Sequence, residues 1–157
     1  MIDMTMTAGS DQTTEYVTAV VGEQLFGLPI SRVQDVFVPA RMTPTPLAAP
    51  EIAGLINLRG RVVTMIDMRR RLDLGVSDQK RAPIAVGVEC KSESYGLLID
   101  EIGEVLMLPV ADRENNPVNL DARLAQVAGG VYRLDGRLMV ILDVDRVLDV
   151  GAGAQAA

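Results

Sequence analysis

The chain has 157 residues, enough for one typical domain or for two very small units that share a core. Hydrophobic residues make up 48% of it but aromatic residues only 3%, so aliphatic side chains must form most of the interior. A net charge of −6 disfavours nucleic acid as a main partner, because binding to a phosphate backbone requires a basic face. With one cysteine and no histidine, neither a zinc site nor a Cys-His nucleophile pair can be built, and we expect no cofactor.

The sequence predicts neither a secretory signal nor a membrane span. The first residues, MIDMTMTAGSDQTTE, are polar and lack a charged region followed by an apolar one. No apolar run reaches the length of a transmembrane helix. We expect residues 1–14 to be a disordered leader and residues 151–157 a flexible tail. A single cysteine, which cannot form an internal disulfide, fits a reducing compartment and therefore a cytoplasmic protein.

Taken in order, the first half of the chain predicts strands. Tyr16 to Val21 and Leu25 to Ile30 are apolar runs separated by a turn. Residues 31–38 fit either a strand or a short helix, and we favour a turn followed by a strand. Residues 40–50 contain three prolines and should form an extended loop. Gly54 to Leu72 then predicts a hairpin that turns at Arg59-Gly60, a second strand buried on both faces, and one helical turn.

The second half begins after a polar linker, and we place a boundary near residues 75–82. Its predicted elements are strands at 83–89, 95–99 and 105–108, a polar loop at 109–119, a weak helix or irregular segment at 120–129, a hairpin from residue 130, and a short helix at 145–150.

Two motifs recur in the same order in both halves. GLINLRGRVVTMIDMRRRL, from Gly54, matches GVYRLDGRLMVILDVDRVL, from Gly130, 76 residues later. GLPISRVQDV, from Gly27, matches GLLIDEIGEV, from Gly96, 69 residues later. Because chance patterning explains one such pair more easily than two, we interpret the chain as an internal duplication. Two repeats are too few for a solenoid, so two small β units packed on each other are expected.

These motifs resemble the CheW-like coupling proteins of bacterial chemotaxis. The resemblance covers roughly residues 15–150 and is carried by five segments: VQDV from Val33, GLINLRG from Gly54, IDMR from Ile66, YGLLID from Tyr95, and VILD from Val140. It implies an all-β fold of two small five-stranded SH3-like barrels with short helical segments. It also implies a third apolar core between the barrels. Family members exchange strands between halves, so the resemblance does not assign each strand to a barrel.

The resemblance implies a function without catalysis. CheW-like proteins are adaptors that couple the cytoplasmic tips of methyl-accepting chemoreceptors to the regulatory domain of a CheA-type histidine kinase. They reach the membrane only through the receptors. The groove between the barrels takes the receptor helix, and the barrel ends contact a kinase module of the same fold. The alternative is a peptide- or ligand-binding module of this fold in a different signalling pathway.

Five residues are candidates for receptor binding. Arg59 matches the arginine of the family's hairpin, and Asp35 stands where the family often has glutamate, so we predict an ion pair between them. The opposing interpretation is a surface pair worth under ~1 kcal/mol. Gly54 allows either a close backbone approach or a simple bulge. Asn57 caps the hairpin or touches the partner, and Val33 is either an anchor for the receptor or part of the core.

The kinase-facing candidates are Met42 and Pro44, in a loop expected to expose a methionine between prolines. A flexible thioether suits an adaptable contact. The basic run Arg69-Arg70-Arg71 is expected to be a solvated face, with contact to an acidic partner as the alternative.

Nothing in the sequence predicts an enzyme. Asp67 and Asp143 occupy equivalent positions in the two repeats, which superficially resembles a pair of catalytic aspartates. The residues that follow them lack the glycine of a small open turn, so caps of strand ends or helices are expected instead. Cys90 has no histidine or basic pair beside it and is expected to be a buried or idle thiol.

Overall fold

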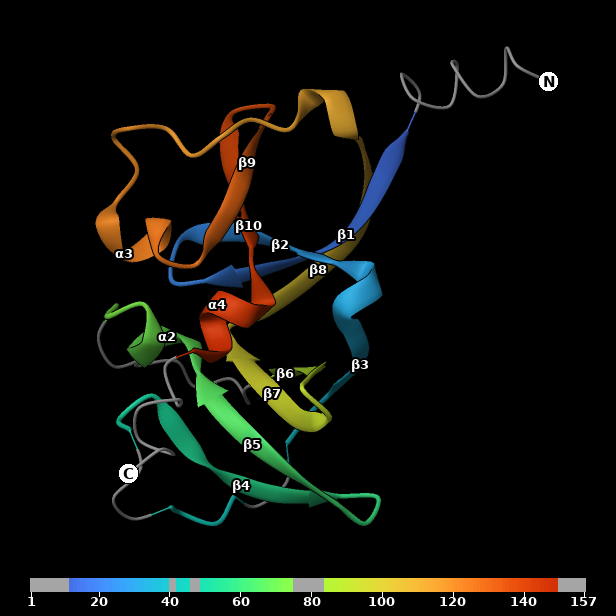
Figure 1. Cartoon of the computed structure of the whole chain (residues 1–157), viewed down its shortest axis with the longest axis vertical. Helices are drawn as coiled ribbons and strands as arrows, with labels where there is room; N and C mark the ends of the chain where they lie inside the picture. Colours follow the sequence, from blue (N-terminus) through green and yellow to red (C-terminus); the bar gives the residue numbers. More distant parts are fainter. Residues whose placement is uncertain (1–11, 40–41, 46–48, 75–83, 150–157) are drawn as a thin grey trace, which may run out of the picture.

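The computed structural model describes residues 12–39, 42–45, 49–74 and 84–149. These residues form ten strands and a few short helical segments (Figure 1). The elements are β1 (Thr13–Val21), β2 (Gln24–Pro29), η1 (Ile30–Arg32), β3 (Val33–Phe37), β4 (Ile52–Leu58), β5 (Arg61–Asp67), α2 (Met68–Arg71), β6 (Ile84–Cys90), β7 (Glu93–Ile99), β8 (Glu101–Pro109), η2 (Val110–Asp112), α3 (Ala122–Ala125), β9 (Ala128–Leu134), β10 (Arg137–Leu142) and α4 (Val144–Leu148).

The strands form two five-stranded sheets, which confirms the predicted fold class. The first sheet has the order β8-β1-β2-β10-β9 and the second the order β3-β6-β7-β5-β4. Neighbouring strands are antiparallel except for two parallel pairs, β10 with β2 and β5 with β7. The described chain passes between the sheets at two places only, from β2 to β3 and from β7 to β8.

The two sheets have the same strand order once the repeats are superposed. Each sheet takes the first two strands of one repeat and the last three of the other. The local geometry repeats as well: Gly54 and Gly130 have φ values of 153° and 131°. Beside each glycine, an isolated bridge joins Thr43 to Leu55 in one repeat and Glu114 to Val131 in the other. The duplicated units are therefore interlocked by strand exchange.

Strand exchange changes the meaning of the expected boundary near residues 75–82. Residues 75–83 lie outside the described ranges, but β6 and β7 on their far side belong to the same sheet as β3, β4 and β5. The chain therefore does not change sheets between β5 and β6, on either side of the expected boundary. The expected leader is also too long, because Thr13 and Thr14 already pair with Pro109 and Leu108 of β8. Residues 1–11 and 150–157 lie outside the described part.

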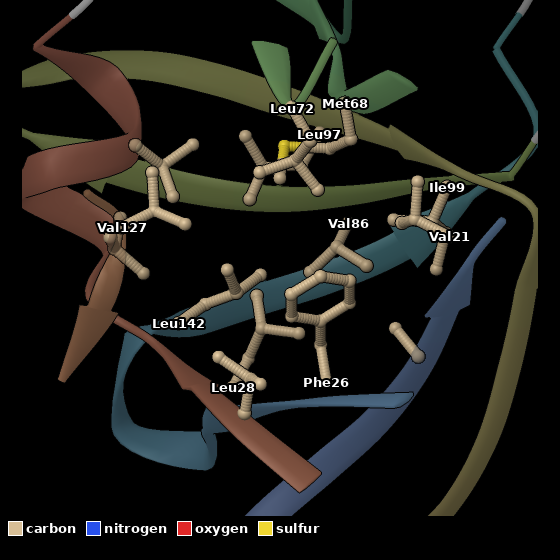
Figure 2. Packing of buried hydrophobic residues seen from close by; sticks show 14 of the residues in the cluster. Val21, Phe26, Leu28, Met68, Leu72, Val86, Leu97, Ile99, Val127 and Leu142 are labelled. Atoms are coloured by element: carbon tan, nitrogen blue, oxygen red, sulfur yellow. The ribbon is translucent and has the colours of Figure 1, made fainter. Parts of the chain in front are cut away.

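The largest apolar cluster lies between the sheets, as expected for a third core. Figure 2 shows Phe26 and Leu28 of the first sheet on one side, and Val86 and Leu97 of the second on the other. All four are fully buried. Two smaller clusters belong to one sheet each. One includes Tyr16, Tyr132, Met139 and Ile141 of the first sheet, and the other includes Ile56, Val63, Met65 and Ala85 of the second.

Two short helices, α2 and α4, follow the equivalent strands β5 and β10. The Asp67 carboxylate accepts the backbone N–H groups of Arg69 and Arg70, and the Asp143 carboxylate accepts that of Arg146. Both aspartates are therefore helix N-caps, as expected, and each satisfies donors that a helix start leaves unpaired.

An ion pair secures each of the two crossings between sheets. After β7, Asp100 is held by Arg69 of α2 through two hydrogen bonds of 3.1 and 2.8 Å, and by the backbone N–H of Gly22 at 2.7 Å. After β2, Arg32 donates to Asp145 of α4 at 3.0 Å. The first pair is largely buried, with side chains only 19% and 9% exposed, whereas the second is more open at 33% and 64%. We call these pairs the inner and outer clamps.

The basic run is not a solvated face, contrary to expectation. Arg69 belongs to the inner clamp, and Arg71 donates to the carbonyl oxygens of Val147 and Arg146 at 3.0 Å each. Arg70 lies 3.8 Å from Asp67, three residues earlier. Two of the three arginines therefore join elements that are distant in sequence, which their local pattern did not reveal.

The strand predictions differ from the structure in two details. Val62 of β5 is 63% exposed, so this strand is not buried on both faces throughout. Strand β8 begins at Glu101 and is longer than expected, because Glu101 and Ile102 pair with Val20 and Ala19 of β1 beyond a shift in the register. Backbone pairing, and not apolar alternation, fixes its length.

We expect a large loss of stability when a side chain is removed from the apolar core between the sheets. Phe26→Ala should lower the free energy of unfolding by about 3–5 kcal/mol, because it removes a fully buried ring and leaves a cavity between the sheets. Val62→Ala, at an exposed site, should change it by less than about 0.5 kcal/mol. Urea unfolding of both variants measures this difference. Equal midpoints for Phe26→Ala and the wild type would contradict the shared core.

We expect the inner and outer clamps to contribute unequally to the free energy of unfolding. Asp100→Ala should destabilise the protein by about 3 kcal/mol, since it leaves the Arg69 guanidinium largely buried without its carboxylate. Asp145→Ala, at the equivalent but exposed clamp, should cost under about 1 kcal/mol. Thermal and urea unfolding of the two variants provide the test. A similar loss for both would show that burial does not distinguish the clamps.

Candidate partner-binding groove

The predicted ion pair between Asp35 and Arg59 is present. Arg59 Nη1 lies 3.4 Å from Asp35 Oδ2, across the gap between edge strand β3 and the β4–β5 turn. Arg59 and Gly60 have positive φ values of 54° and 83°, which suit the tight hairpin turn expected there. The side chain of Arg59 is 78% exposed and that of Asp35 only 30% exposed. The Arg59 guanidinium is therefore accessible from solvent, and the less exposed Asp35 carboxylate fixes its position.

Gly87 makes room for the Asp35 carboxylate and was missed by sequence reasoning. It pairs with Asp35 in the β3–β6 ladder. A Cβ at this position would lie 2.2 Å from Asp35 Oδ1, far closer than atoms can approach. Any other residue would displace the carboxylate. The glycine is visible in the sequence, but only the strand pairing shows which side chain it accommodates.

A pocket of about 280 Å³ opens beside this ion pair, and we call it the hairpin pocket. Its apolar walls are Phe37, Leu58 and Val63, and its charged side chains are Asp35, Arg59 and Arg61. The remaining lining residues are Gln34, Gly87, Ser94 and Tyr95. An apolar floor with a few oriented polar groups at the rim is the usual composition of a site that binds a peptide side chain.

A second pocket of about 650 Å³ adjoins the first where the sheets meet, and we call it the α4 pocket. Both pockets are lined by Tyr95. Gln34 of the first donates to Glu89 of the second at 2.9 Å, and Arg61 lies 3.9 Å from the same carboxylate. The α4 pocket is lined by Arg32, Glu89, Cys90, Lys91, Glu93, Tyr95, Asp145, Leu148 and Asp149. Because Tyr95 lines both pockets, we treat them together and name them the partner groove.

The outer clamp forms part of the wall of this groove. A hydrogen bond from Arg32, and then one from the Cys90 thiol, holds the pKa of Asp145 below its usual range. Burial, followed by the hydrogen bond to Asp145, raises the pKa of Cys90. The thiol is therefore neutral at physiological pH, and the expected idle role of Cys90 agrees with its surroundings.

The other receptor-binding candidates do not line the groove. Val33 packs against the shared core, which favours its structural interpretation. Gly54 lies under the loop before β4, and a Cβ there would approach the Thr43 carbonyl oxygen to 2.7 Å. The β4–β5 register also shifts beside it, so close approach and bulge occur together. Asn57 is exposed, and its side-chain oxygen accepts the Gly60 N–H at 3.0 Å, so it caps the hairpin.

The two kinase-facing candidates differ in exposure. Met42 was expected to be exposed, but it is half-buried against the cluster that contains Ile56 and Met65. A thioether fills this space because it is flexible and apolar. Pro44 is exposed. Arg41, which precedes them, lies outside the described residues.

The groove residues missed by sequence reasoning include Glu89, Tyr95, Arg32 and Asp145. They come from η1, the β6–β7 hairpin and α4, which only the fold brings together. In the described part of the chain, no group of three or more cysteine or acidic side chains is placed to hold a metal ion. None of the helices in the described ranges has the length and apolar character needed to cross a bilayer.

Known proteins resemble this chain in both sequence and fold. It is 28% identical over 133 residues to the chemotaxis protein CheW of Rhizobium meliloti, covering 85% of this chain and 86% of that protein. It is 25% identical over 135 residues to the chemotaxis protein CheW of Thermotoga maritima, covering 86% and 87%. The crystal structure of the scaffolding protein TtCheW from Thermoanaerobacter tengcongensis matches with a TM-score of 0.75 at 26% identity, covering 83% and 89%. The family model of the CheW-like domain matches residues 15–151, and the chain belongs to this family.

Proposed function

We propose that this protein is a non-enzymatic cytoplasmic adaptor in bacterial chemotaxis. It couples the cytoplasmic tips of chemoreceptors to the regulatory domain of a CheA-type histidine kinase. The observation that carries this proposal is the exposed Arg59, which Asp35 holds at the mouth of the partner groove in a chain of the CheW-like family. Named relatives are chemotaxis proteins and a scaffolding protein, which supports the assignment.

The receptor helix binds in the partner groove. Strands β6 and β7 beneath the groove are interior strands of their sheet, so their backbone groups are already paired and cannot accept an added strand. A helix that inserts apolar side chains into the two pockets satisfies this geometry. Arg59 and Arg61 at the rim then provide oriented charges. Val33, Gly54 and Asn57 act indirectly, by holding the strand and hairpin that carry Asp35 and Arg59.

The kinase contact involves the loop at Met42 and Pro44. Pro44 is exposed and conformationally restricted, so it loses little entropy when it is covered. Met42 anchors the loop by packing against the apolar cluster of the second sheet. Each contact of the adaptor need only be weak, because contacts in an extended assembly act together through effective concentration.

Calorimetry with both partners tests the adaptor function. The purified protein is titrated with the regulatory domain of the organism's own chemotaxis histidine kinase, and then with a helical fragment of the receptor tip. Saturable binding of both at separable sites is expected. If a folded protein binds neither, the coupling role is wrong, and the peptide- or ligand-binding alternative replaces it.

A first variant separates receptor binding from stability. Arg59→Ala should weaken binding of the receptor fragment about three- to tenfold, since it removes a charge that faces the groove. The free energy of unfolding should change by under about 1 kcal/mol, because the Asp35 pair is exposed. Arg133→Ala is the matched control: Arg133 pairs with Glu114 at 3.0 Å on the other sheet and is 63% exposed. Unchanged affinity of Arg59→Ala would remove Arg59 from the interface.

A second variant tests the kinase-facing loop. Pro44→Glu should weaken kinase binding at least about threefold, because it places a charge on a covered surface. Binding of the receptor fragment should be unchanged and serves as the internal control. Met42→Asp is a poorer probe, since a charge in the second-sheet cluster would also destabilise the fold. Kinase affinity equal to that of the wild type would exclude Pro44 from the contact.

A further inference from the structure

We propose that the partner groove is electrically polar and that this polarity fixes the direction in which the bound helix lies. Acidic side chains of the helix face the hairpin pocket, and basic side chains face the α4 pocket. This inference rests on the proposed function, because it assumes that a receptor helix occupies the groove. It adds the charge pattern that the helix must carry.

The hairpin pocket presents positive charge to solvent. Two arginines, Arg59 and Arg61, stand against one aspartate. Their side chains are 78% and 58% exposed, whereas Asp35 is 30% exposed and engaged by Arg59. Arg61 also lies 3.9 Å from Glu89 of the α4 pocket, so Arg59 is the most exposed charge at this end of the groove, and its guanidinium group binds carboxylates well.

The α4 pocket presents negative charge. Its lining includes the acidic residues Glu89, Glu93, Asp145 and Asp149 and the basic residues Arg32 and Lys91. Arg32 lies deeper than Asp145 and donates both to that carboxylate and to the Glu89 carbonyl oxygen, at 3.0 and 3.2 Å. Its charge is thus already engaged by the protein. Asp145, Asp149 and Glu93 are exposed at this end, and so is Lys91, so exposed acidic side chains outnumber exposed basic ones by three to one among these four.

The floor of each pocket includes apolar side chains. Leu58 and Val63 lie in the hairpin pocket, Tyr95 lines both pockets, and Cys90 and Leu148 lie in the α4 pocket. An amphipathic helix bound in one direction places its apolar side on this floor. Its acidic side chains then lie at the hairpin pocket and its basic side chains at the α4 pocket. The reversed helix buries the same apolar area but brings like charges together, so charge selects between the two directions.

Asp149→Lys tests the α4 end. Asp149 follows the last turn of α4, where a cation is compatible with the helix dipole, so the fold should be retained. The dissociation constant of the receptor-tip fragment should rise about three- to tenfold at low salt, and this difference should shrink at high salt. Asp112→Lys, on η2, is the matched control and should bind as the wild type does.

A charge swap on the fragment then tests direction. Fragments whose lysines and arginines are changed to glutamate near one end or near the other are titrated into Asp149→Lys. Restored affinity with only one of the two fragments supports the proposal. Wild-type affinity of Asp149→Lys, or restoration by both fragments or neither, overturns it. If the wild-type protein does not bind the unmodified fragment at all, the proposed function itself fails, and this outcome is distinct from the others.

Discussion

Burial of the apolar faces of two small sheets against each other is the constraint on which the structure depends. Aromatic residues are scarce, and the interior is built from aliphatic side chains such as Leu28, Val86 and Leu97 around a single Phe26. A five-stranded sheet of this size buries only a small cluster of its own and would be marginally stable alone. Strand exchange between the repeats joins the two sheets into one core, and the crossings it requires lie at the edge of that core.

The crossings show where the duplicated units have diverged. At the inner clamp the helix supplies the cation, Arg69, and the crossing supplies Asp100. At the outer clamp the helix supplies the anion, Asp145, and the crossing supplies Arg32. The buried pair is suited to hold the sheets in register, because its charges are enclosed and satisfied. The exposed pair instead leaves a carboxylate at the surface of the groove.

The same divergence explains why only the second sheet carries the Asp35–Arg59 site. In the other repeat, Asp135 occupies the position of Arg59 and Glu104 that of Asp35, so two carboxylates stand where an ion pair would be needed. Thr18 occupies the position of Gly87, and its hydroxyl donates to the Glu104 carbonyl oxygen at 2.7 Å. A pocket of about 300 Å³ lies at the equivalent place in the first sheet, with Thr18, Glu104 and Arg137 in its lining. Of the two equivalent pockets, only the hairpin pocket has an exposed arginine paired with an aspartate.

The sequence by itself determined the features that depend on local backbone preference or on repetition: the hairpin turn at Gly60, the helix cap at Asp67, the two-fold duplication, and the family motif that identified Asp35 and Arg59 as partners. Only the tertiary structure decided that the repeats exchange strands, that Arg69 is a largely buried clamp and not a solvated charge, and that the two pockets adjoin at Tyr95. The physical reason is that apolar alternation and turn residues record whether a side chain is buried, and not which distant strand or charge buries it.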